Sequence, residues 1–171
     1  MKKGITGLIT AVDFFVFYQL LLGDRTIHLT FAEQEHRQAA ERLRNISYQI
    51  NYLPERQMTA TELTDMLARQ RSFAEFSQSI FIREGTTFQQ RVWDRICQIP
   101  SGATKNYGSL AQSLGNKALA RAVGQACGAN PIALLIPCHR VVGHTGLGGF
   151  AGGIDLKKQL LALEKEQIPT T

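Results

Sequence analysis

A cysteine and a histidine stand side by side in an otherwise apolar run, Ile136-Pro137-Cys138-His139-Arg140-Val141-Val142. Apolar runs normally become buried strand or core, where a thiol is an inert small hydrophobe. Here a potential base and a cation follow the thiol, and a proline fixes the backbone before it. Thiols with such neighbours are the ones that become nucleophiles. The run therefore predicts that Cys138 is a nucleophile.

Length and composition bound the fold class and the compartment. With 171 residues, of which 44% are hydrophobic, the chain can bury a real core as one domain or as two small ones. Its three cysteines form no CxxC pair, and such an odd set suits a reducing cytoplasm. No apolar run could span a bilayer, and no secretory signal follows the N-terminal lysines. We expect a cytoplasmic monomer with no membrane partner, no metal and no other cofactor.

The net charge of +5 is concentrated in the second half of the chain. Residues 1–84 carry ten basic and ten acidic side chains, whereas residues 85–171 carry nine basic and four acidic ones. This asymmetry favours a polyanionic partner for the C-terminal half, although it also serves solubility.

The first 84 residues predict a domain of strands followed by helices, in which nothing assembles a site. The turn signal Gly23-Asp24 separates two β-prone runs, and helix formers follow them. Thr59 or Thr61 can cap a later helix, because Glu62 stands three residues after Thr59. His28 and His36 are expected to be surface or packing residues. The expected strands are 14–22, 26–31 and 48–53, and the expected helices are 33–44 and 59–69.

Gly85 is the predicted boundary to a second, mostly helical domain, residues 85–171. Thr86 or Thr87 can cap a helix whose apolar side chains recur every three or four residues, and Pro100-Ser101-Gly102 ends it. Two short helices follow, 107–114 and 117–127, joined by Gly115-Asn116. This pattern predicts a helix-turn-helix, although many helical hairpins share it.

The second of these helices has almost no large side chains. Alanine or glycine occupies every second position from 118 to 126, so Arg121 is its main long, exposed-type side chain. A major-groove recognition helix normally carries several base-reading polar side chains. A thin helix with one projecting cation fits the minor groove better, which is about 6 Å wide. Tight packing against another helix is the alternative.

Taken together, the motifs of the C-terminal half resemble one known family. They are Phe88-Gln89-x-x-Val92-Trp93, Ile99-Pro100-x-Gly102-x-Thr104, Tyr107-Gly108-x-Leu110-Ala111, Ala120-Arg121-Ala122-Val123-Gly124, Asn130-Pro131 and Pro137-Cys138-His139-Arg140-Val141-Val142, with Gly146, Gly148-Gly149-Phe150, Gly152-Gly153, Lys157, Leu160-Leu161 and Glu164 continuing the match. In this order they resemble the active domain of the O6-alkylguanine-DNA alkyltransferases, the methylated-DNA–protein-cysteine methyltransferases. The match covers roughly Ile80 to Glu166, about half of the chain.

This resemblance implies a function and a fold. Members of the family repair double-stranded DNA by moving an alkyl group from O6 of guanine, mainly a methyl group, irreversibly onto their own cysteine. The implied fold is α+β, with an RNase-H-like α/β domain over residues 1–84 and a mostly helical domain with a helix-turn-helix over residues 85–171. No signature of its own supports the N-terminal fold, which follows by association only.

The resemblance also implies roles around the acceptor, Cys138. A free thiol has a pKa of about 8.5, so its surroundings must convert it to thiolate. In the family, the residue matching Glu164 orients the histidine matching His139, which contacts the cysteine through a water molecule. Asn130 matches the asparagine that holds the active-site turn, and Arg140 matches a mainly structural arginine. Without the resemblance, Glu164 reads as a solvated helix residue.

Further implied roles concern the DNA. Chemistry on a base inside a duplex requires extruding the nucleotide, at a cost of a few kcal/mol. The residue matching Arg121 enters the base stack through the minor groove, and the one matching Tyr107 rotates the phosphate and donates a proton to the leaving guanine. Backbone groups of Cys138, Val141 and Ala151 would contact the flipped base. The expected DNA-binding set is Tyr107, Asn116, Ala120, Arg121, Ala122 and Gly124.

Two positions depart from the family pattern. Phe150 stands where many members carry tyrosine, so the rim of the base pocket lacks a hydroxyl group. Ala133 stands where some members have a proline that forms a wall against bulky alkyl groups. These two substitutions predict that methyl groups are handled better than benzyl groups.

Three other functions compete with this interpretation. A non-catalytic alkyltransferase-like damage sensor would lack the acceptor cysteine, which is present here. A Cys–His hydrolase would need an oxyanion hole, and it explains neither the thin helix nor Arg121. A zinc site from Cys127, Cys138, His139 and His144 would have adjacent ligands and no CxxC spacing, which is poor metal-binding geometry.

Overall fold

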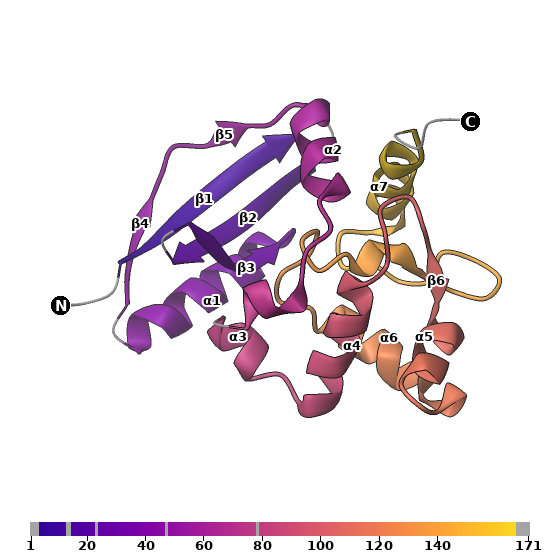
Figure 1. The fold of residues 1–171 in the computed structure, drawn as a ribbon. Helices are drawn as coiled ribbons and strands as arrows, with labels where there is room; N and C mark the ends of the chain where they lie inside the picture. The colour runs from indigo at the N-terminus through magenta and orange to yellow at the C-terminus, as the bar shows by residue number, and fades with distance from the viewer. Residues whose placement is uncertain (1–3, 13–14, 23, 47, 78, 167–171) are drawn as a thin grey trace.

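A five-stranded sheet builds the N-terminal half of the computed structural model, which describes residues 4–12, 15–22, 24–46, 48–77 and 79–166 (Figure 1). Strands β1 (Gly4–Val12), β2 (Phe15–Leu22) and β3 (Arg25–Thr30) form an antiparallel meander. Helix α1 (Glu33–Asn45) then crosses over, so that β4 (Gln49–Tyr52) and β5 (Arg56–Gln57) pair parallel with β1. The main strand order is β3-β2-β1-β4.

The predicted elements of this half are confirmed within a few residues, except that Phe14 lies outside the described residues. Strand β1 was not predicted, because its glycines are depleted in strands. Gly7 is there for space: a Cβ atom on it would lie 2.4 Å from the ring of Tyr52 on the neighbouring strand. Helix α1 buries Ala39, Ala40 and Leu43, an apolar stripe typical of a helix packed on a sheet.

Helices dominate the remainder of the chain, and local capping explains where the first of them begin. Thr59 and Glu62 form a capping box at α2 (Ala60–Ala68), as expected, and Thr86 with Gln89 does the same at α4 (Thr87–Cys97). Two helical turns lie between them, η1 (Phe73–Phe76) and α3 (Ile80–Arg83). Within the described residues, no helix is both long and apolar enough to cross a membrane.

The two short helices of the C-terminal half differ in part from the prediction. Helix α5 (Tyr107–Ser113) is found, but the expected helix 117–127 is split into a 3-10 turn, η2 (Lys117–Leu119), and α6 (Ala120–Gly128). The reason is local: the Asn116 side chain accepts the Ala118 N–H at 2.9 Å, and the Leu119 N–H bonds the Asn116 carbonyl at 3.1 Å. Such short bonds tighten the first turn.

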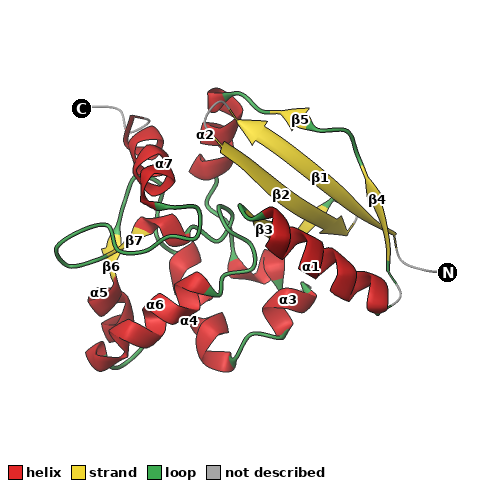
Figure 2. Ribbon diagram, turned by 180° about the vertical axis from the view of Figure 1, so that it is seen from behind, coloured by secondary structure: helices red, strands yellow, loops and turns green. Residues whose placement is uncertain are grey.

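Residues 136–142, which we call the reactive segment, belong to the C-terminal half of the molecule, and the strand at their end is labelled β7 (Val141–Val142; Figure 2). The reactive segment contains the 3-10 turn η3 (Cys138–Arg140) and β7, which pairs with β6 (Lys105–Asn106); α7 (Ile154–Glu166) follows. Just before it, the Leu29 N–H bonds the Pro131 carbonyl and the Ala133 N–H bonds the Leu29 carbonyl, at 2.9 and 3.0 Å. The segment is thereby attached to β3.

A shared core joins the two halves. Its largest cluster combines Phe17 and Leu29 of the sheet and Leu63 of α2 with Trp93 and Ile132 from beyond Gly85. Helices α2 and α7 also lie side by side (Figures 1 and 2). The predicted domain boundary at Gly85 therefore runs through a continuous apolar interior.

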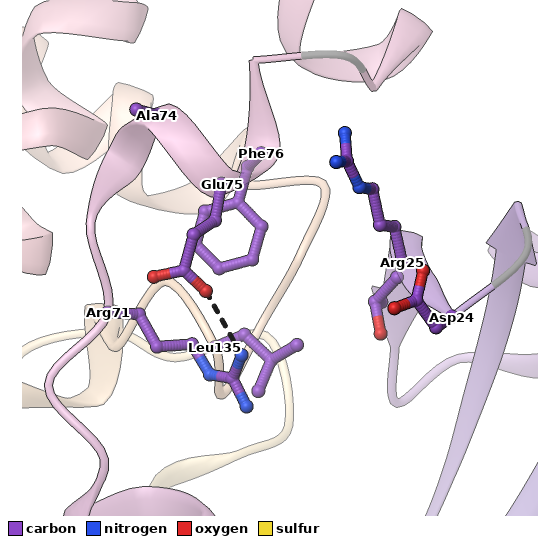
Figure 3. A pocket seen from close by; sticks show the side chains of 8 residues that line it. Asp24, Arg25, Arg71, Ala74, Glu75, Phe76 and Leu135 are labelled. Carbon is purple, nitrogen blue, oxygen red and sulfur yellow. Dashed lines mark hydrogen bonds and ion pairs between the residues drawn. The ribbon is translucent and has the colours of Figure 1, made fainter.

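A polar cavity of about 380 Å³ opens at this junction, away from Cys138 (Figure 3). Arg25 extends from the start of β3 on one side, and Arg71 pairs with Glu75 on the other at 3.3 Å. Leu135 and Phe76 form its apolar part. Positive and negative side chains alternate around it, so its lining favours no single sign of ligand charge.

His28 and His36 are both buried, between the sheet and the helices that cover it. Burial, helped by the nearby positive charges of His36 and Arg42, lowers the pKa of His28 to about 4 from 6.5. Between pH 6.5 and 4, His28 therefore binds a proton in the unfolded chain but not in the folded chain. Folding stability falls as pH falls wherever the unfolded state binds more protons.

We therefore expect the free energy of unfolding to drop as pH is lowered from 6.5 to 4, by up to about 3 kcal/mol from His28. Urea unfolding at a series of pH values measures this. His28→Leu should flatten the profile, whereas the same change at His144, in an exposed loop, should leave it unchanged. An unchanged slope in His28→Leu would contradict the assignment.

Candidate active site

A largely apolar cavity of about 680 Å³ lies where α5, α6, the reactive segment and the loop before α7 meet. Its volume falls within the usual range of small-molecule sites, about 300–1,000 Å³. Predicted site residues from distant parts of the chain meet here. The lining residues are Tyr107, Ala120, Arg121, Gly124, Gln125, Cys127, Gly128, Cys138, Gly149, Phe150 and Ala151.

Asn130 holds the turn that presents Cys138. Its Oδ1 accepts the Ile132 N–H at 3.0 Å, while its Nδ2 donates to the Ile136 carbonyl at 2.8 Å and to the Cys138 Sγ at 3.2 Å. Leu134 within this turn has φ +66°, unlike any other described residue except glycines. Such a conformation is strained for leucine. One amide thus fixes both the backbone before the cysteine and the position of its sulfur.

His139 and Arg140 both bind Glu164 of α7. Glu164 Oε1 lies 2.8 Å from His139 Nε2 and 2.9 Å from Arg140 Nη2, and all three side chains are buried. Arg140 also donates to the carbonyls of Leu67 and Ile99, at 2.7 and 2.6 Å. Arg140, two residues after the cysteine in sequence, is therefore part of a buried cluster of charged side chains.

This cluster fixes the ionisation of its members. Burial opposes ionisation of Glu164, but hydrogen bonds from His139 and Arg140 outweigh it and lower its pKa to about 2. Burial lowers the pKa of His139, and Glu164 offsets part of that shift. The imidazole is therefore neutral at pH 7, with its Nε2 bonded to an ionised carboxylate.

The thiol itself is held protonated. Cys138 is 7% exposed, and burial raises the pKa of its thiol, opposed by the Asn130 hydrogen bond and the positive charge of Lys157. Adjacency in the sequence did not guarantee that the His139 side chain contacts this sulfur. In the structure, Asn130 is the side chain that bonds the sulfur and Lys157 is the cation that favours its thiolate form.

Lys157 is a site residue to which sequence reasoning gave no role. Its side chain is fully buried, and Nζ donates to the carbonyls of Val141 and Leu147, both at 2.6 Å, and of Gly149 at 3.2 Å. It therefore fastens the loop that forms one wall of the cavity. Spacing was the available signal, because Lys157 shares the apolar face of α7 with Leu160, Leu161 and Glu164.

Tyr107 and Phe150 both line the cavity. The Tyr107 hydroxyl lies 3.4 Å from the Gly149 carbonyl, and a Cβ atom on Gly148 would lie 2.9 Å from that hydroxyl. Burial raises the pKa of Tyr107, so its hydroxyl keeps its proton at neutral pH. Phe150 packs on Phe31 and His139, with ring centroids 5.4 and 6.3 Å apart.

Arg121 is exposed at the mouth of the cavity, on the first turn of α6. Ala120 and Gly124 line the cavity beside it, whereas Asn116 caps the preceding turn and Ala122 is half-buried.

Ala133 and Val141 are buried and lie outside the cavity lining. In the described parts of the chain, no three His, Cys, Asp or Glu side chains could together hold a metal ion.

Comparison with known proteins agrees with this geometry. Residues 87–166 match the family model described as 6-O-methylguanine DNA methyltransferase, DNA binding domain. The methylated-DNA–protein-cysteine methyltransferase of Mycobacterium tuberculosis (strain ATCC 25618 / H37Rv) is 51% identical over 96 residues, which cover 56% of this chain and 58% of that protein. The namesake from Methanosarcina acetivorans is 51% identical over 82 residues, 47% of this chain and 53% of its own. The chain thus matches little more than half the length of these relatives.

Solved structures match over nearly the whole chain. The crystal structure of Mycobacterium tuberculosis O6-methylguanine methyltransferase superposes with a TM-score of 0.68 at 26% identity, covering 98% of this chain and 96% of that one. The structure of Mycobacterium tuberculosis OGT in complex with DNA gives 0.63 at 29% identity over the same shares. Motifs, site geometry and comparisons agree, and residues 87–166 are similar to the DNA-binding domain of the 6-O-methylguanine DNA methyltransferases.

Proposed function

We propose that this protein repairs alkylated DNA by moving an alkyl group, mainly methyl, from O6 of guanine to Cys138. One observation carries the proposal: Cys138 lines an apolar cavity and its sulfur is oriented by Asn130, within a domain that matches the methyltransferase family. Its relatives of about 50% identity bear the name methylated-DNA–protein-cysteine methyltransferase.

The chemistry is one displacement at carbon. The Cys138 sulfur forms a bond to the alkyl carbon while the bond from that carbon to O6 breaks, and the guanine leaves. The thiol proton passes through a water molecule to Nδ1 of His139, which has no hydrogen-bond partner among the described residues. Nδ1 can accept this proton because Nε2 carries the other one and donates it to Glu164. Glu164 is ionised and therefore stabilises the imidazolium that forms. Tyr107 donates a proton to the leaving base; afterwards the phenolate takes up a proton from solvent and the imidazolium releases one. Among the described residues, none is placed to remove the alkyl group from the Cys138 sulfur, so each protein molecule reacts once.

Access to the base requires extrusion from the duplex. Helix α6 offers small side chains at Ala120, Ala122 and Gly124, and Arg121 projects from its exposed side. We propose that α5, η2 and α6 act as a helix-turn-helix that enters the minor groove. Arg121 then occupies the vacated place in the stack, while the flipped guanine fills the cavity beside Phe150 and Ala151.

The rest of the molecule supports this domain. Its strand order and crossover helix fit an RNase-H-like N-terminal domain, residues 1–84, attached through the core to the DNA-binding and acceptor domain, residues 85–171. We propose that the protein acts in the cytoplasm as a monomer and needs no cofactor, because the displacement uses only its own thiol, base and acid.

Intact-mass measurement after mixing with O6-methylguanine duplex tests the proposal. We expect each chain to gain one methyl group, on the peptide that contains Cys138, and reaction to stop at one equivalent. Continued turnover with excess substrate would refute single use. An unmodified protein that binds the duplex would instead identify a damage sensor.

Arg121→Ala should slow repair of duplex DNA at least about tenfold while leaving attack on free O6-methylguanine base nearly unchanged. Extrusion costs a few kcal/mol, and a free base needs none. Rates on both substrates measure the difference, with Lys158→Ala, an exposed cation on α7, as the control. Equal losses on both substrates would place Arg121 in the chemistry instead.

A further inference from the structure

A second thiol, Cys127, lines the cavity that contains Cys138. It lies on the last turn of α6, on the face that also carries Ala120 and Gly124 into the cavity wall. Both thiols are free. The displacement proposed above uses only Cys138 and gives Cys127 no role.

The surroundings of the two sulfurs show that they face one space. The Cys127 and Cys138 sulfurs both raise the pKa of Tyr107, after the larger effect of burial, and both also act on the pKa of Lys157 when they are ionised. Each such effect requires proximity, because Coulomb interactions weaken with distance. Cys97, the third cysteine, is buried in the core and lies outside this lining.

Cys127 does not compete with Cys138 for a methyl group. Burial strongly raises the pKa of its thiol, and the neighbouring Cys138 sulfur raises it further. A thiol that holds its proton is a poor nucleophile toward weak electrophiles. A strong electrophile that forms inside the cavity, next to Cys127, would not require the thiol to ionise first.

Building on the proposed function, we propose that Cys127 is a second acceptor for alkyl groups that carry a leaving group on their second carbon, such as 2-haloethyl groups. Transfer of such a group leaves Cys138–S–CH₂–CH₂–X. The thioether sulfur displaces the halide and closes a three-membered sulfonium ring. Cys127 sulfur then attacks a ring carbon, its proton goes to solvent, and the ring C–S bond opens. The products are a dithioether, S–CH₂–CH₂–S, and HX.

The apolar cavity decides between two fates of the sulfonium ring. Water would open it to a 2-hydroxyethyl group, but the lining holds few polar groups to position water. Without capture, a DNA nucleophile attacks the electrophilic ring carbon, the ring C–S bond opens, and the protein is crosslinked to its substrate. Closure onto Cys127 instead ends the reaction within one polypeptide.

The test measures the share of alkylated Cys138 that is bridged to Cys127. Protein is mixed with freshly prepared O6-(2-chloroethyl)guanine duplex and, in a parallel arm without DNA, with 1,2-dibromoethane. Peptide mapping in the presence of a reductant distinguishes the dithioether from a disulfide. We expect most alkylated chains to gain two carbon and two hydrogen atoms, with the Cys127 and Cys138 peptides joined.

Matched variants make the outcome decisive. Cys127→Ser and Cys127→Ala should lose the bridge and leave a 2-hydroxyethyl group on Cys138, whereas Cys97→Ala should still form the bridge. Wild-type Cys138 carrying only 2-hydroxyethyl, beside an unmodified Cys127, would overturn the inference even if methyl transfer proceeds. If the DNA arm leaves Cys138 unmodified, the proposed function fails, and the dibromoethane arm still decides whether the two sulfurs can be bridged.

Discussion

Cys138→Ser should abolish alkyl transfer completely while DNA binding survives. Serine keeps the shape of the side chain, so the Asn130 amide that bonds the sulfur can still hold the turn. A hydroxyl without strong activation is a far weaker nucleophile than a thiol. The proposed DNA contacts, led by Arg121, lie on α6 and do not involve the sulfur.

Two measurements on the same preparation check this expectation. Transfer of a labelled methyl group from duplex DNA reports the chemistry, and a gel-shift titration reports binding. Cys97→Ser is the control, because Cys97 is a buried thiol outside the cavity. Loss of both properties in Cys138→Ser would make the cysteine structural, and transfer that persists would reveal another acceptor.

Glu164→Ala should destabilise the folded protein by about 3–5 kcal/mol, the usual cost of breaking a buried ion pair by removing one partner. Its carboxylate accepts from His139, from Arg140 and from the Gly102 N–H at 3.1 Å. Removing it leaves the Arg140 charge buried without a counter-ion. Urea unfolding measures the loss, and Glu166→Ala on the exposed side of α7 should change stability by less than about 0.5 kcal/mol.

A double-mutant cycle separates the charge from the packing. If the unpaired Arg140 causes the loss, Glu164→Ala combined with Arg140→Met should cost less than the sum of the single changes. Strict additivity would show that the two residues do not interact energetically. Because the pKa of Glu164 is lowered from 4.5 to about 2, its stabilising effect is present above pH 4.5 and is lost as pH falls through 2.

Local signals predicted the helices better than the site. Capping boxes placed the starts of α2 and α4, and the apolar spacing within α4 agrees with its buried face. Strand β1 escaped prediction because its pairing with β2, β4 and β5 stabilises it despite its glycines. Pairing of this kind links residues far apart in sequence, which no local pattern contains.

The residues of the candidate site also fall into two groups, those that the sequence motifs predicted and those that only the tertiary structure revealed. Family motifs pointed to Cys138, Tyr107, Arg121 and Asn130, and the structure brings all four to one cavity or its supporting turn. Arg140 matches a mainly structural arginine in the family, and its guanidinium reaches the Leu67 carbonyl, 73 residues away, a contact that no local pattern contains. The clamp by Lys157 and the shared cavity of Cys127 depend on how α7 and α6 pack, so tertiary structure was needed to find them.

The order of the chain gives the buried cluster a role during synthesis. A ribosome releases the segment around Cys138 before it releases Lys157 and Glu164, both of which lie on α7. Until α7 emerges, Arg140 has no counter-ion and the loop at Leu147 and Gly149 has no lysine to hold it. Domains generally fold as units once their sequence is available. A nascent chain therefore carries an unassembled thiol, and completion of the reactive site coincides with the release of α7.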